Sequence, residues 1–579
     1  MRFRVQRLWQ AVLIDETEFD EMKAPTQAAS FMNWLKRNEW YLVLTVALLA
    51  FVCGLAGLYQ FLVAAGQDAS WLDLVYFTIR LFTLSYDLQG EVTPYVTSVP
   101  ALLQVARFLA PATVIYAAAK TFTLAAAYQI NVWGLRRWRG HAVVCGAGKR
   151  GRQVAFALRA EGRQVVVIER VGEAETLAEL RATGVRVIIG SATDPAHQAQ
   201  ARLQEAGMVV AATPSEESNL EVALAASRRN ATGSMEILVH ASRQFAGLFE
   251  QQPPFDRIRQ SVHARFFDHD VSAARLLLQE FATNLATELA RQPRPPRLFL
   301  AGDGSLLPEL LGAAVTQCHY AFAGVPRLVV ATADGEVLRR RFPILHPQLG
   351  QVAEVNFLEL TSADLARLEL ASLPGGADFD LVFVACRDDL DTLSLARRLA
   401  QQGVGTAYRT VACLRPSTNL MRLLATKQPI PGVEIRDLVE LGCRADVLLH
   451  GELDREARAI HEGYVQTQTA AGATEATNPA LVVWENLPES LRQANRAQAD
   501  HIPVKLRALG VARTEAMLEA LAEAEHRRWM AEKIVAGWRH AEQRDNARKL
   551  HPSLKPYSQL SEPEKQKDRD TVQTVLKKM

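Results

Sequence analysis

Apolar positions are spread unevenly along the chain, and the longest unbroken run lies near its start. No charged residue stands between Glu39 and Asp68, and residues 40–65 read WYLVLTVALLAFVCGLAGLYQFLVAA. A helix of about 20 apolar residues crosses the hydrocarbon core of a bilayer, and Trp40 and Tyr41 are typical of its interface. The run starts too late and is too long for a secretory signal, so it predicts a membrane-spanning helix.

A second span is expected near residues 98–127, where the apolar pattern is weaker. Pro111 is expected to kink this helix, and Arg107 and Lys120 interrupt its hydrophobic surface. Two interpretations stay open: these cations reach opposite membrane interfaces, or one of them faces a pore or polar cavity. Basic residues flank both spans, which predicts that both termini are cytosolic and the chain is a multi-pass protein of the inner (plasma) membrane. These flanking residues are Lys36, Arg37, Arg136, Arg137 and Arg139.

The stretch between the two spans is apolar but too short to cross a bilayer. Residues 71–84, WLDLVYFTIRLFTL, fit a re-entrant pore helix or a helix that lies in the interface. Thr83, Tyr86 and Gly90 stand where a pore filter is expected, but the Gly-Tyr-Gly run of a potassium filter is absent. This loop therefore gives no basis for potassium selectivity. Residues 1–14 fit a basic amphipathic helix on the inner leaflet or an ordinary packed helix.

A glycine-rich turn between an apolar strand and a helix follows the membrane region, within residues 141–170. Gly146 is expected to allow the tight turn, Gly148 to let a pyrophosphate approach the backbone, and Gly151 to let helix and strand pack closely. The helix N-terminus adds positive partial charge. Glu169 ends the next strand about 20 residues further on, where a carboxylate can bind a ribose. The pattern predicts a dinucleotide-binding, Rossmann-like domain.

The ligand of this motif is left open between NAD(H) and an adenine nucleotide. Glu169 favours an unphosphorylated 2′-hydroxyl, whereas Arg170 beside it would accommodate a 2′-phosphate. Lys149 and Arg150 in the turn are candidates for neutralising phosphates. The alternative is that the glycines serve packing alone and the domain binds nothing.

The segment that follows carries two further turns, GSATD at 190–194 and ATPSEESN at 212–219. Over roughly residues 140–240 the chain resembles the RCK (TrkA-N) regulatory domain of potassium channels and transporters, although Ser191 replaces the acid that is usual in the first turn. The resemblance implies a doubly wound domain that binds a nucleotide as a sensor. It adds three candidate ligand-binding residues, Thr193, Asp194 and Thr213.

The pattern recurs in degenerate form after a Pro-rich joint at 291–297. An apolar strand leads to Gly-Asp-Gly at 302–304, but Leu307 stands where the third glycine would be. Asp303 would repel a pyrophosphate at close range, so a packing role is favoured for this second copy. The minority interpretation is a different ligand, or a cation at the acidic turn of residues 388–391.

Composition narrows the function further. Lys and Arg number 65 against 63 Asp and Glu, a net charge of +2, and residues 521–579 are only mildly basic, so nucleic acid is not an expected partner. The six cysteines form no CxxC pair and no zinc-spaced cluster, so no metal site is assigned. No Tyr-x-x-x-Lys pair accompanies the dinucleotide motif. We therefore assign no catalytic residues and do not expect an enzyme.

The C-terminal region is helical in pattern and rich in Trp, His and Arg. Residues 525–572 resemble the RyR domain of ryanodine receptors and some bacterial proteins. The matched features are His526, Trp529, Lys533, Gly537-Trp538, Asp545, Lys549, His551-Pro552, Leu554 and Tyr557. Aromatic planes beside cationic donors suit a small pocket for an anionic, nucleotide-like ligand.

The candidate contact residues of this pocket come from two helical blocks. They are Asn495, Arg496, His501, Lys505, His526, Trp529, Lys533, Trp538, Arg544, Lys549 and His551. The alternative is that they form the core of a helical hairpin pair. Core packing is favoured for Trp529 and Trp538, and the two alternatives are evenly balanced for Arg496, Lys505 and Lys533.

Together these patterns predict a membrane α-helical hairpin plus α/β architecture, with two tandem Rossmann-like domains and a mostly helical RyR domain. The expected domains are 1–135, 136–290, 291–465 and 480–579. The expected function is nucleotide-gated ion transport of the potassium type by a homo-oligomer, a tetramer or dimer, in the lipid bilayer. The alternative is a membrane effector of a bacterial defence system that a nucleotide second messenger activates.

The glycine turn makes a direct prediction. Replacing Gly148 by Asp places a carboxylate where a pyrophosphate would approach, so binding of NAD or an adenine nucleotide should weaken. Isothermal titration calorimetry of the cytosolic part measures this. An unchanged affinity would remove the first Rossmann-like domain from the mechanism.

Overall fold

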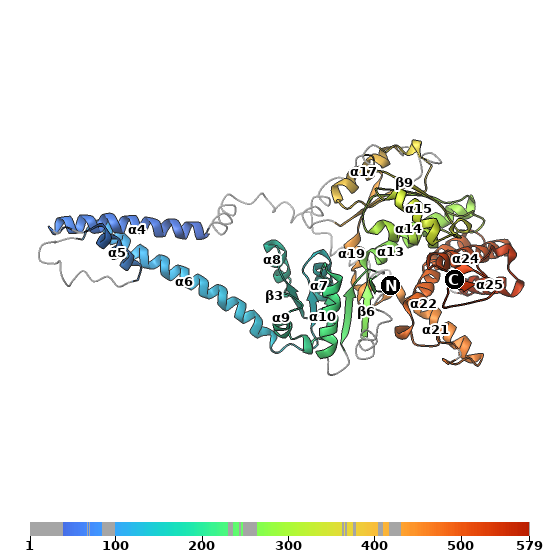
Figure 1. Cartoon of the computed structure of the whole chain (residues 1–579), viewed down its shortest axis with the longest axis horizontal. Coiled ribbons are helices and arrows are strands. Elements are labelled where there is room, and N and C mark those ends of the chain that lie inside the picture. Colours follow the sequence, from blue (N-terminus) through green and yellow to red (C-terminus); the bar gives the residue numbers. More distant parts are fainter. Residues whose placement is uncertain are drawn as a thin grey trace, which may run out of the picture. The chain divides into compact units, whose positions relative to one another are not determined.

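The computed structural model describes residues 39–66, 68, 70–83, 99–229, 235–242, 245–246, 263–361, 364, 368–373, 378–402, 409–415, 430–476 and 478–577. The chain divides into two compact units, Met1–Gly134 and Leu135–Met579, and Figure 1 shows their elements. The predicted residues Tyr86 and Gly90, and the predicted helix over 1–14, lie outside the described residues.

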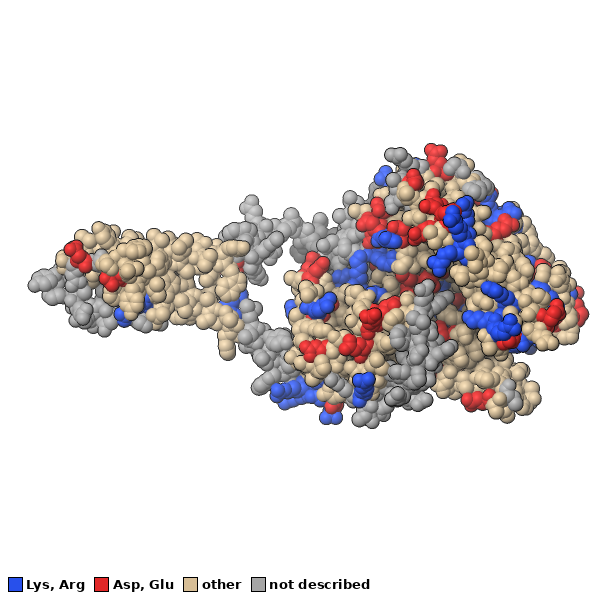
Figure 2. Space-filling model, viewed as in Figure 1, with Lys and Arg blue, Asp and Glu red and all other residues tan. Residues whose placement is uncertain are grey.

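Among the described residues, the first unit contains the helices α4 (Glu39–Ala64), α5 (Trp71–Phe82) and α6 (Ala101–Leu135), the last of which ends at the first residue of the second unit. In the described residues, α4 and the segment Ala101–Phe122 of α6 are long and apolar enough to cross a membrane. Their outward faces are apolar, with Leu44 at 70%, Phe108 at 71% and Phe122 at 73% exposure, and Figure 2 shows few charged side chains on this unit. The two expected apolar helices are therefore present.

Two glycines of α4 allow its neighbours to pack closely. A Cβ at Gly57 would lie 2.4 Å from the backbone nitrogen of Leu103 in α6, and a Cβ at Gly54 would lie 2.9 Å from Cδ1 of Leu81 in α5. Small residues of this kind let helix backbones approach each other where the hydrophobic effect cannot drive association. The short helix α5 thus packs against α4, and Thr83 forms its C-cap.

A pair of opposite charges joins the start of α4 to α6. Lys120 Nζ donates to both carboxylate oxygens of Glu39 at 3.0 Å, and the Tyr116 hydroxyl donates to the same carboxylate. Arg107 donates to Gln104 Oε1 at 3.4 Å. Each of the two predicted cations of α6 therefore has a polar partner within the unit, and the cost of placing Lys120 in an apolar helix is reduced by its counter-charge.

The second unit begins with a six-stranded parallel sheet in the order β3-β2-β1-β4-β5-β6. Its strands are β1 (Ala142–Cys145), β2 (Val165–Glu169), β3 (Arg186–Ile189), β4 (Met208–Ala211), β5 (Glu236–His240) and β6 (His263–Phe267). The covering helices are α7 (Lys149–Ala160), α8 (Ala174–Ala182), α9 (Pro195–Gln200) and α10 (Glu216–Arg229). The order reverses between β1 and β4, which creates a crevice at the carboxyl ends of these strands.

A second parallel sheet repeats this order as β9-β8-β7-β10-β11-β12. Its strands are β7 (Arg297–Ala301), β8 (Arg327–Thr332), β9 (Glu354–Glu359), β10 (Leu381–Val384), β11 (Arg409–Leu414) and β12 (Val433–Asp437). Its helices include α14 (Leu306–Gln317), α15 (Gly335–Leu345) and α17 (Asp389–Gln402). Alternate residues of β7 face opposite cores, Leu298 and Leu300 toward α14, Phe299 and Ala301 toward α17. The predicted pair of Rossmann-like domains is confirmed.

Long and short helices tie the two sheets together. The helix α13 (His269–Arg291) connects them, and α19 (Leu438–Gly442) and α20 (Ala445–Leu448) pack back onto the first sheet. A Cβ at Gly442 would lie 2.2 Å from the carbonyl oxygen of His269, so α19 touches the start of α13 directly. The second domain therefore contributes part of the wall of the first.

The C-terminal region is helical, as expected. It contains α21 (Arg455–Ala470), α22 (Glu489–Asp500), α23 (Ile502–Val511), α24 (Glu515–Val535) and α25 (Glu562–Leu576), with short strands β13 (Arg539–His540) and β14 (Leu550–His551). Short 3-10 turns occur at Leu203–Glu205, Leu349–Gln351, Leu370–Ser372, Glu452–Asp454, Trp484–Asn486 and Tyr557–Gln559. Val504, Met530 and Ile534 share one core with Leu300 of the second sheet, so this region is packed onto the second Rossmann-like domain rather than tethered beside it.

The close packing at Gly57 predicts a sensitive position. Gly57→Val should force α4 and α6 apart and lower the stability of the first unit by about 1–3 kcal/mol, the usual cost of overpacking. Thermal unfolding of the full chain in detergent measures the effect. Val52→Leu, on the exposed face of the same helix, is the matched control and should leave the transition unchanged. Equal unfolding temperatures for Gly57→Val and Val52→Leu would contradict the close contact between α4 and α6 at Gly57.

Candidate nucleotide site

The three glycines of the first turn differ in what surrounds them. Gly146 has φ +104°, and a Cβ there would lie 3.1 Å from the carbonyl oxygen of Ala212. A Cβ at Gly151 would lie 2.0 Å from the carbonyl oxygen of Gly146. A Cβ at Gly148, by contrast, would meet no described heavy atom within 4 Å. Close packing inside the protein therefore requires glycine at positions 146 and 151. The backbone of Gly148, by contrast, faces open space.

This open space lies at the N-terminus of α7. Gly148 is the N-cap residue, and no described side chain caps the helix. The first amides of a helix carry unsatisfied N–H groups and a positive partial charge, which favours an anion there. The next two residues, Lys149 and Arg150, add full positive charges. The start of α7 thus offers the chemistry that binds phosphate.

Both cations are held by the surrounding protein. Lys149 Nζ donates to the backbone carbonyl of Arg415 in the second domain. Arg150 Nη1 lies 2.9 Å from Nδ1 of His240, and its Nη2 donates to the carbonyl of Thr213 at 3.5 Å. Their side chains are therefore positioned in advance, which lowers the entropy lost when a ligand binds.

The carboxylate predicted to bind a ribose is directed at the glycine turn. Glu169, at the end of β2, accepts hydrogen bonds from the backbone amides of Ala147 and, at 3.1 Å, Val171. A ribose hydroxyl could bind the same carboxylate, because a carboxylate has about four acceptor positions. Arg170 next to it is exposed. The position of Glu169 is as predicted, and its role in binding stays a prediction.

The two turns of the TrkA-N resemblance serve the local backbone. Asp194 caps α9 by accepting from the amide of Ala196 at 2.8 Å, and the Thr193 hydroxyl lies 2.9 Å from that of Ser191. In the second turn, Asn219 Oδ1 accepts from the Thr213 amide at 2.8 Å and from its hydroxyl at 2.7 Å. The Asn219 amide also donates to the carbonyl of His240 at 3.0 Å. Asn219 closes the turn motif at 212–219 but is not among the predicted site residues, and it joins the turn after β4 to the end of β5.

A cavity of about 360 Å³ opens in front of the glycine turn. Its lining residues are Gly148, Lys149, Arg150, Ala212, Pro214, His269, Arg415 and Val439. Three of these were predicted from the glycine motif. Ala212 and Pro214 belong to the second turn of the TrkA-N resemblance, so that turn already signalled them. His269, Arg415 and Val439 come from α13 and the second domain, and nothing in the local sequence indicates that they face this cavity.

Two buried histidines lie at the cavity: His269 is one of its lining residues, and the ring of His240 lies 5.4 Å from that of His269. Burial, with the charge of Arg150 adding to it, lowers the pKa of His240 to about 3, and burial lowers the pKa of His269 to about 4. Burial raises the pKa of Asp268 to about 6. Among the described residues, His240, Asp268 and His269 place ligand atoms within 4.8 Å of one another, close enough for a metal ion. The Arg150 guanidinium already lies against His240, so a metal cation would have to displace it.

The second glycine turn is closed by the protein. A Cβ at Gly302 would lie 2.2 Å, and one at Gly304 2.7 Å, from the carbonyl oxygen of Ala385. Asp303 accepts from the backbone amide of Arg387 at 2.9 Å. The space that lies open at Gly148 is thus occupied by backbone here, which favours the packing role predicted for this copy. In the acidic turn, Asp388 caps α17 by accepting from the amide of Leu390 at 2.8 Å.

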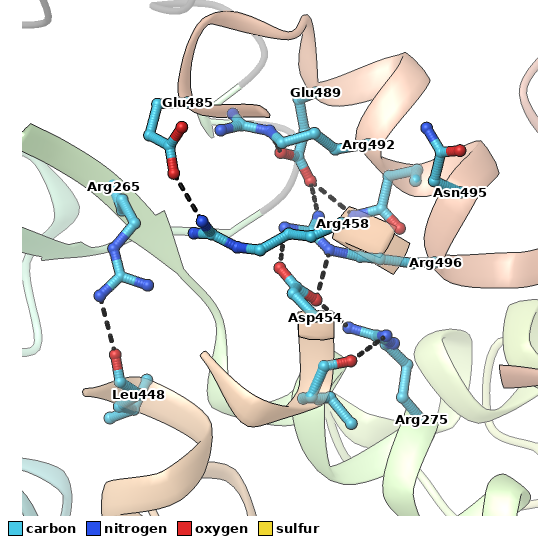
Figure 3. A network of polar contacts seen from close by, with 12 residues as sticks. Arg265, Arg275, Leu448, Asp454, Arg458, Glu485, Glu489, Arg492, Asn495 and Arg496 are labelled. Carbon is cyan, nitrogen blue, oxygen red and sulfur yellow. Dashed lines mark hydrogen bonds and ion pairs between the residues drawn. The ribbon is translucent and has the colours of Figure 1, made fainter. Parts of the chain in front are cut away.

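In the C-terminal region, one group of the predicted pocket residues lies in a buried ionic network (Figure 3). Arg496 donates to both oxygens of Asp454, at 2.9 and 2.7 Å, and also pairs with Glu489. Arg275 of α13 donates to the same Asp454 at 3.1 Å and to Asp500 at 2.8 Å. Burial would raise the pKa of Asp454, but the two guanidinium groups hold it below its ordinary value. The stability that the ionised Asp454 contributes through Arg496 and Arg275 is therefore present at neutral pH. It is lost as the pH falls through the lowered pKa of Asp454.

A second group is buried in the core of the C-terminal helices. Lys505 Nζ donates to Glu525 at 2.6 Å, and burial lowers the pKa of Lys505. His501 Nε2 lies 2.7 Å from the carbonyl of His319, and His526 Nε2 lies 2.9 Å from that of Lys555. These cationic and imidazole groups already have protein partners. Asn495 likewise donates to the carbonyl of Leu491 at 2.9 Å.

The remaining predicted residues form a half-buried aromatic cluster. The ring of His551 lies 5.0 Å from that of Trp529 and 6.2 Å from that of Trp538, and Lys533 Nζ lies 5.5 Å from the Trp538 ring. Burial, with the charges of Arg544 and Lys533, lowers the pKa of His551 to about 4, so its ring is neutral at neutral pH. Lys549 donates to the carbonyl of Ala536 at 2.9 Å, and Arg544 to Asn546 at 2.9 Å.

Two family models match the chain. Residues 142–251 match the TrkA-N domain and residues 503–579 match the RyR domain. These matches confirm the two resemblances found in the sequence. The chain therefore carries a TrkA-N domain after its apolar helices and a RyR domain at its C-terminal end. The search of curated proteins found no match.

Similar solved structures include a point mutant of GsuK, which is 16% identical, with coverage of 73% of this chain and 99% of that chain and a TM-score of 0.36. The GsuK channel bound to NAD is 14% identical, covering 73% of this chain and 84% of that chain, with a TM-score of 0.33. The TrkA-N domain of the Escherichia coli inner membrane protein ybaL is 23% identical, covering 25% and 98%, with a TM-score of 0.21.

The buried ion pair between Arg275 and Asp500 predicts a large effect of a single charge. Asp500→Asn should cost about 3–5 kcal/mol of stability, because it leaves the buried Arg275 guanidinium partly uncompensated. Chemical denaturation of the full chain measures this. The Asp378 side chain is 86% exposed and pairs with Arg297. Asp378→Asn is therefore the matched control, and it should lower the stability by at most about 1 kcal/mol. Similar costs for both variants would contradict the assigned burial.

Proposed function

We propose that the first Rossmann-like domain binds NAD(H) or an adenine nucleotide and acts as a sensor. The observation that carries the proposal is the open backbone at Gly148, the one position of the glycine turn where a Cβ would meet no described atom within 4 Å. It borders a cavity lined by Lys149, Arg150 and Arg415. An uncapped helix N-terminus and three cations suit the phosphates of such a ligand.

A sensing role fits the chemistry that the cavity offers. Its lining side chains are cationic or apolar, apart from His269, whose lowered pKa of about 4 keeps the ring neutral. Such a site can hold and orient an anion. We therefore propose binding without turnover, so that the ligand acts by stabilising one arrangement of the protein over another.

We further propose that the apolar helices span the inner membrane and that both termini are cytosolic. The support is the length of α4 and α6 and the exposure of their large apolar side chains, which lipid would cover. The covalent connection is short, because α6 ends at Leu135 and β1 begins at Ala142. Leu135 is buried in the core of the first sheet. We propose that a change in the nucleotide domain is transmitted to the apolar helices through this short connection.

On this basis the chain is proposed to form a homo-oligomer, a tetramer or dimer, that transports ions of the potassium type under nucleotide control. Coupling between a ligand site and a second site typically amounts to about 1–3 kcal/mol. The second candidate is a membrane effector of a bacterial defence system. It is favoured by the lack of a Gly-Tyr-Gly run after residue 83 and by the RyR domain, whose half-buried Trp529, Trp538 and His551 could stack on a base.

Flux measurements on the full chain in liposomes distinguish these candidates. If the chain is a nucleotide-gated channel, ADP or NAD should change potassium flux, and sodium flux should be smaller. The Gly148→Asp variant tests whether the response depends on the proposed site. Its flux without nucleotide should equal that of the wild type, and added nucleotide should no longer change it. Leakage of a larger dye only after nucleotide addition would support the effector. Liposomes that stay tight under every condition would contradict both.

A further inference from the structure

Arg415 reaches the nucleotide cavity from the second Rossmann-like domain. It follows β11, yet it is one of the residues that line the cavity in front of the first glycine turn. Lys149 of that turn, 266 positions earlier in the chain, donates to its backbone carbonyl. The two domains therefore meet at this residue.

The backbone and side chain of Arg415 are both held in place. Its backbone amide donates to Asp389 Oδ1 at 2.8 Å. Its guanidinium Nη2 donates to Asp270 Oδ1 at 2.6 Å and to the Ser305 hydroxyl at 3.0 Å. Both of these side-chain contacts use the same nitrogen, and a guanidinium carries five N–H donors in a planar fork. The contacts thus hold the guanidinium beside Asp270, the residue that follows His269 of the cavity lining.

The charge balance at this wall favours an anion. Three cationic groups, Lys149, Arg150 and Arg415, line the cavity, and the buried carboxylate of Asp270 is the acceptor of the Arg415 guanidinium. The same Asp270 lies 3.4 Å from Nε2 of His269. The carboxylates of Asp268 and Asp437 also act on these cations, but the described lining of the cavity contains no acidic residue. Phosphate oxygens would place negative charge inside the cavity, and arginine binds phosphate with two parallel hydrogen bonds.

We propose that Arg415 contacts the phosphates of the bound nucleotide, so that the site is completed by the second Rossmann-like domain. This inference rests on the proposed nucleotide binding. It also gives a role to the second Rossmann-like domain, whose own glycine turn is closed. The described glycine turn of the second domain, at Gly302 and Gly304, is closed by backbone, but this domain supplies a phosphate-binding side chain to the first. Nucleotide binding then strengthens the contact between the two domains, because the same ligand touches α7 and Arg415.

Calorimetry on the full chain in detergent tests the proposal with ADP and adenosine as probes. Arg415→Gln should weaken ADP binding roughly 10–100-fold, the loss expected for charge-assisted hydrogen bonds, and leave adenosine binding unchanged. Arg409→Gln is the matched control, because Arg409 starts the same strand, is half exposed and does not line the cavity. It should bind both probes like the wild type.

The outcomes separate this inference from the proposed function. Wild-type ADP binding that Arg415→Gln leaves unchanged would overturn the role of Arg415 alone. Equal losses for ADP and adenosine would show a structural role and also overturn it. A wild-type chain that binds neither probe would overturn the proposed function together with this inference. Arg415→Lys keeps the charge but not the fork, and an intermediate ADP affinity with normal adenosine binding would support the phosphate contact.

Discussion

The positive end of α7 is fixed at the carboxyl edge of the first sheet by a backbone contact that only glycine allows. The carbonyl of Gly146 lies where a side chain at residue 151 would begin. This contact sets the distance between β1 and α7, and it leaves Gly148 facing open space. The same geometry places Lys149 and Arg150 beside the opening, because both extend from the first turn of α7. In the second domain the equivalent space is filled by Ala385, and no such opening remains at Gly302 and Gly304.

The helix α13 links this site to the C-terminal region. Its first turn carries His269 and Asp270 beside the cavity, and Arg275, less than two turns later, is held by Asp454 and Asp500 of the C-terminal region. The helix α13 therefore connects the cavity wall to the buried ionic network. The RyR domain also shares its core with the second Rossmann-like domain. These contacts give a physical basis for coupling between the nucleotide domain and the RyR domain.

Local pattern was sufficient for much of the fold. Buried strands followed by glycine turns predicted both Rossmann-like domains, and the turn at Gly148 was identified with its helix. The site needed more, since Arg415 and His269 reach the cavity through contacts between elements that are distant in sequence. The same limit applies to Arg496 and Lys505. Their residue types suit an anionic ligand, but the sequence cannot show that the carboxylates of Asp454 and Glu525 lie beside them in the folded chain.

The central claim is that the phosphates of a nucleotide lie against the N-terminus of α7, within reach of both Rossmann-like domains. The most direct measurement is an experimental structure of the full chain determined with ADP. The account predicts phosphate density within hydrogen-bonding distance of the backbone at Gly148 and of the Arg415 guanidinium. ADP bound at the RyR domain instead, with none at Gly148, would contradict it.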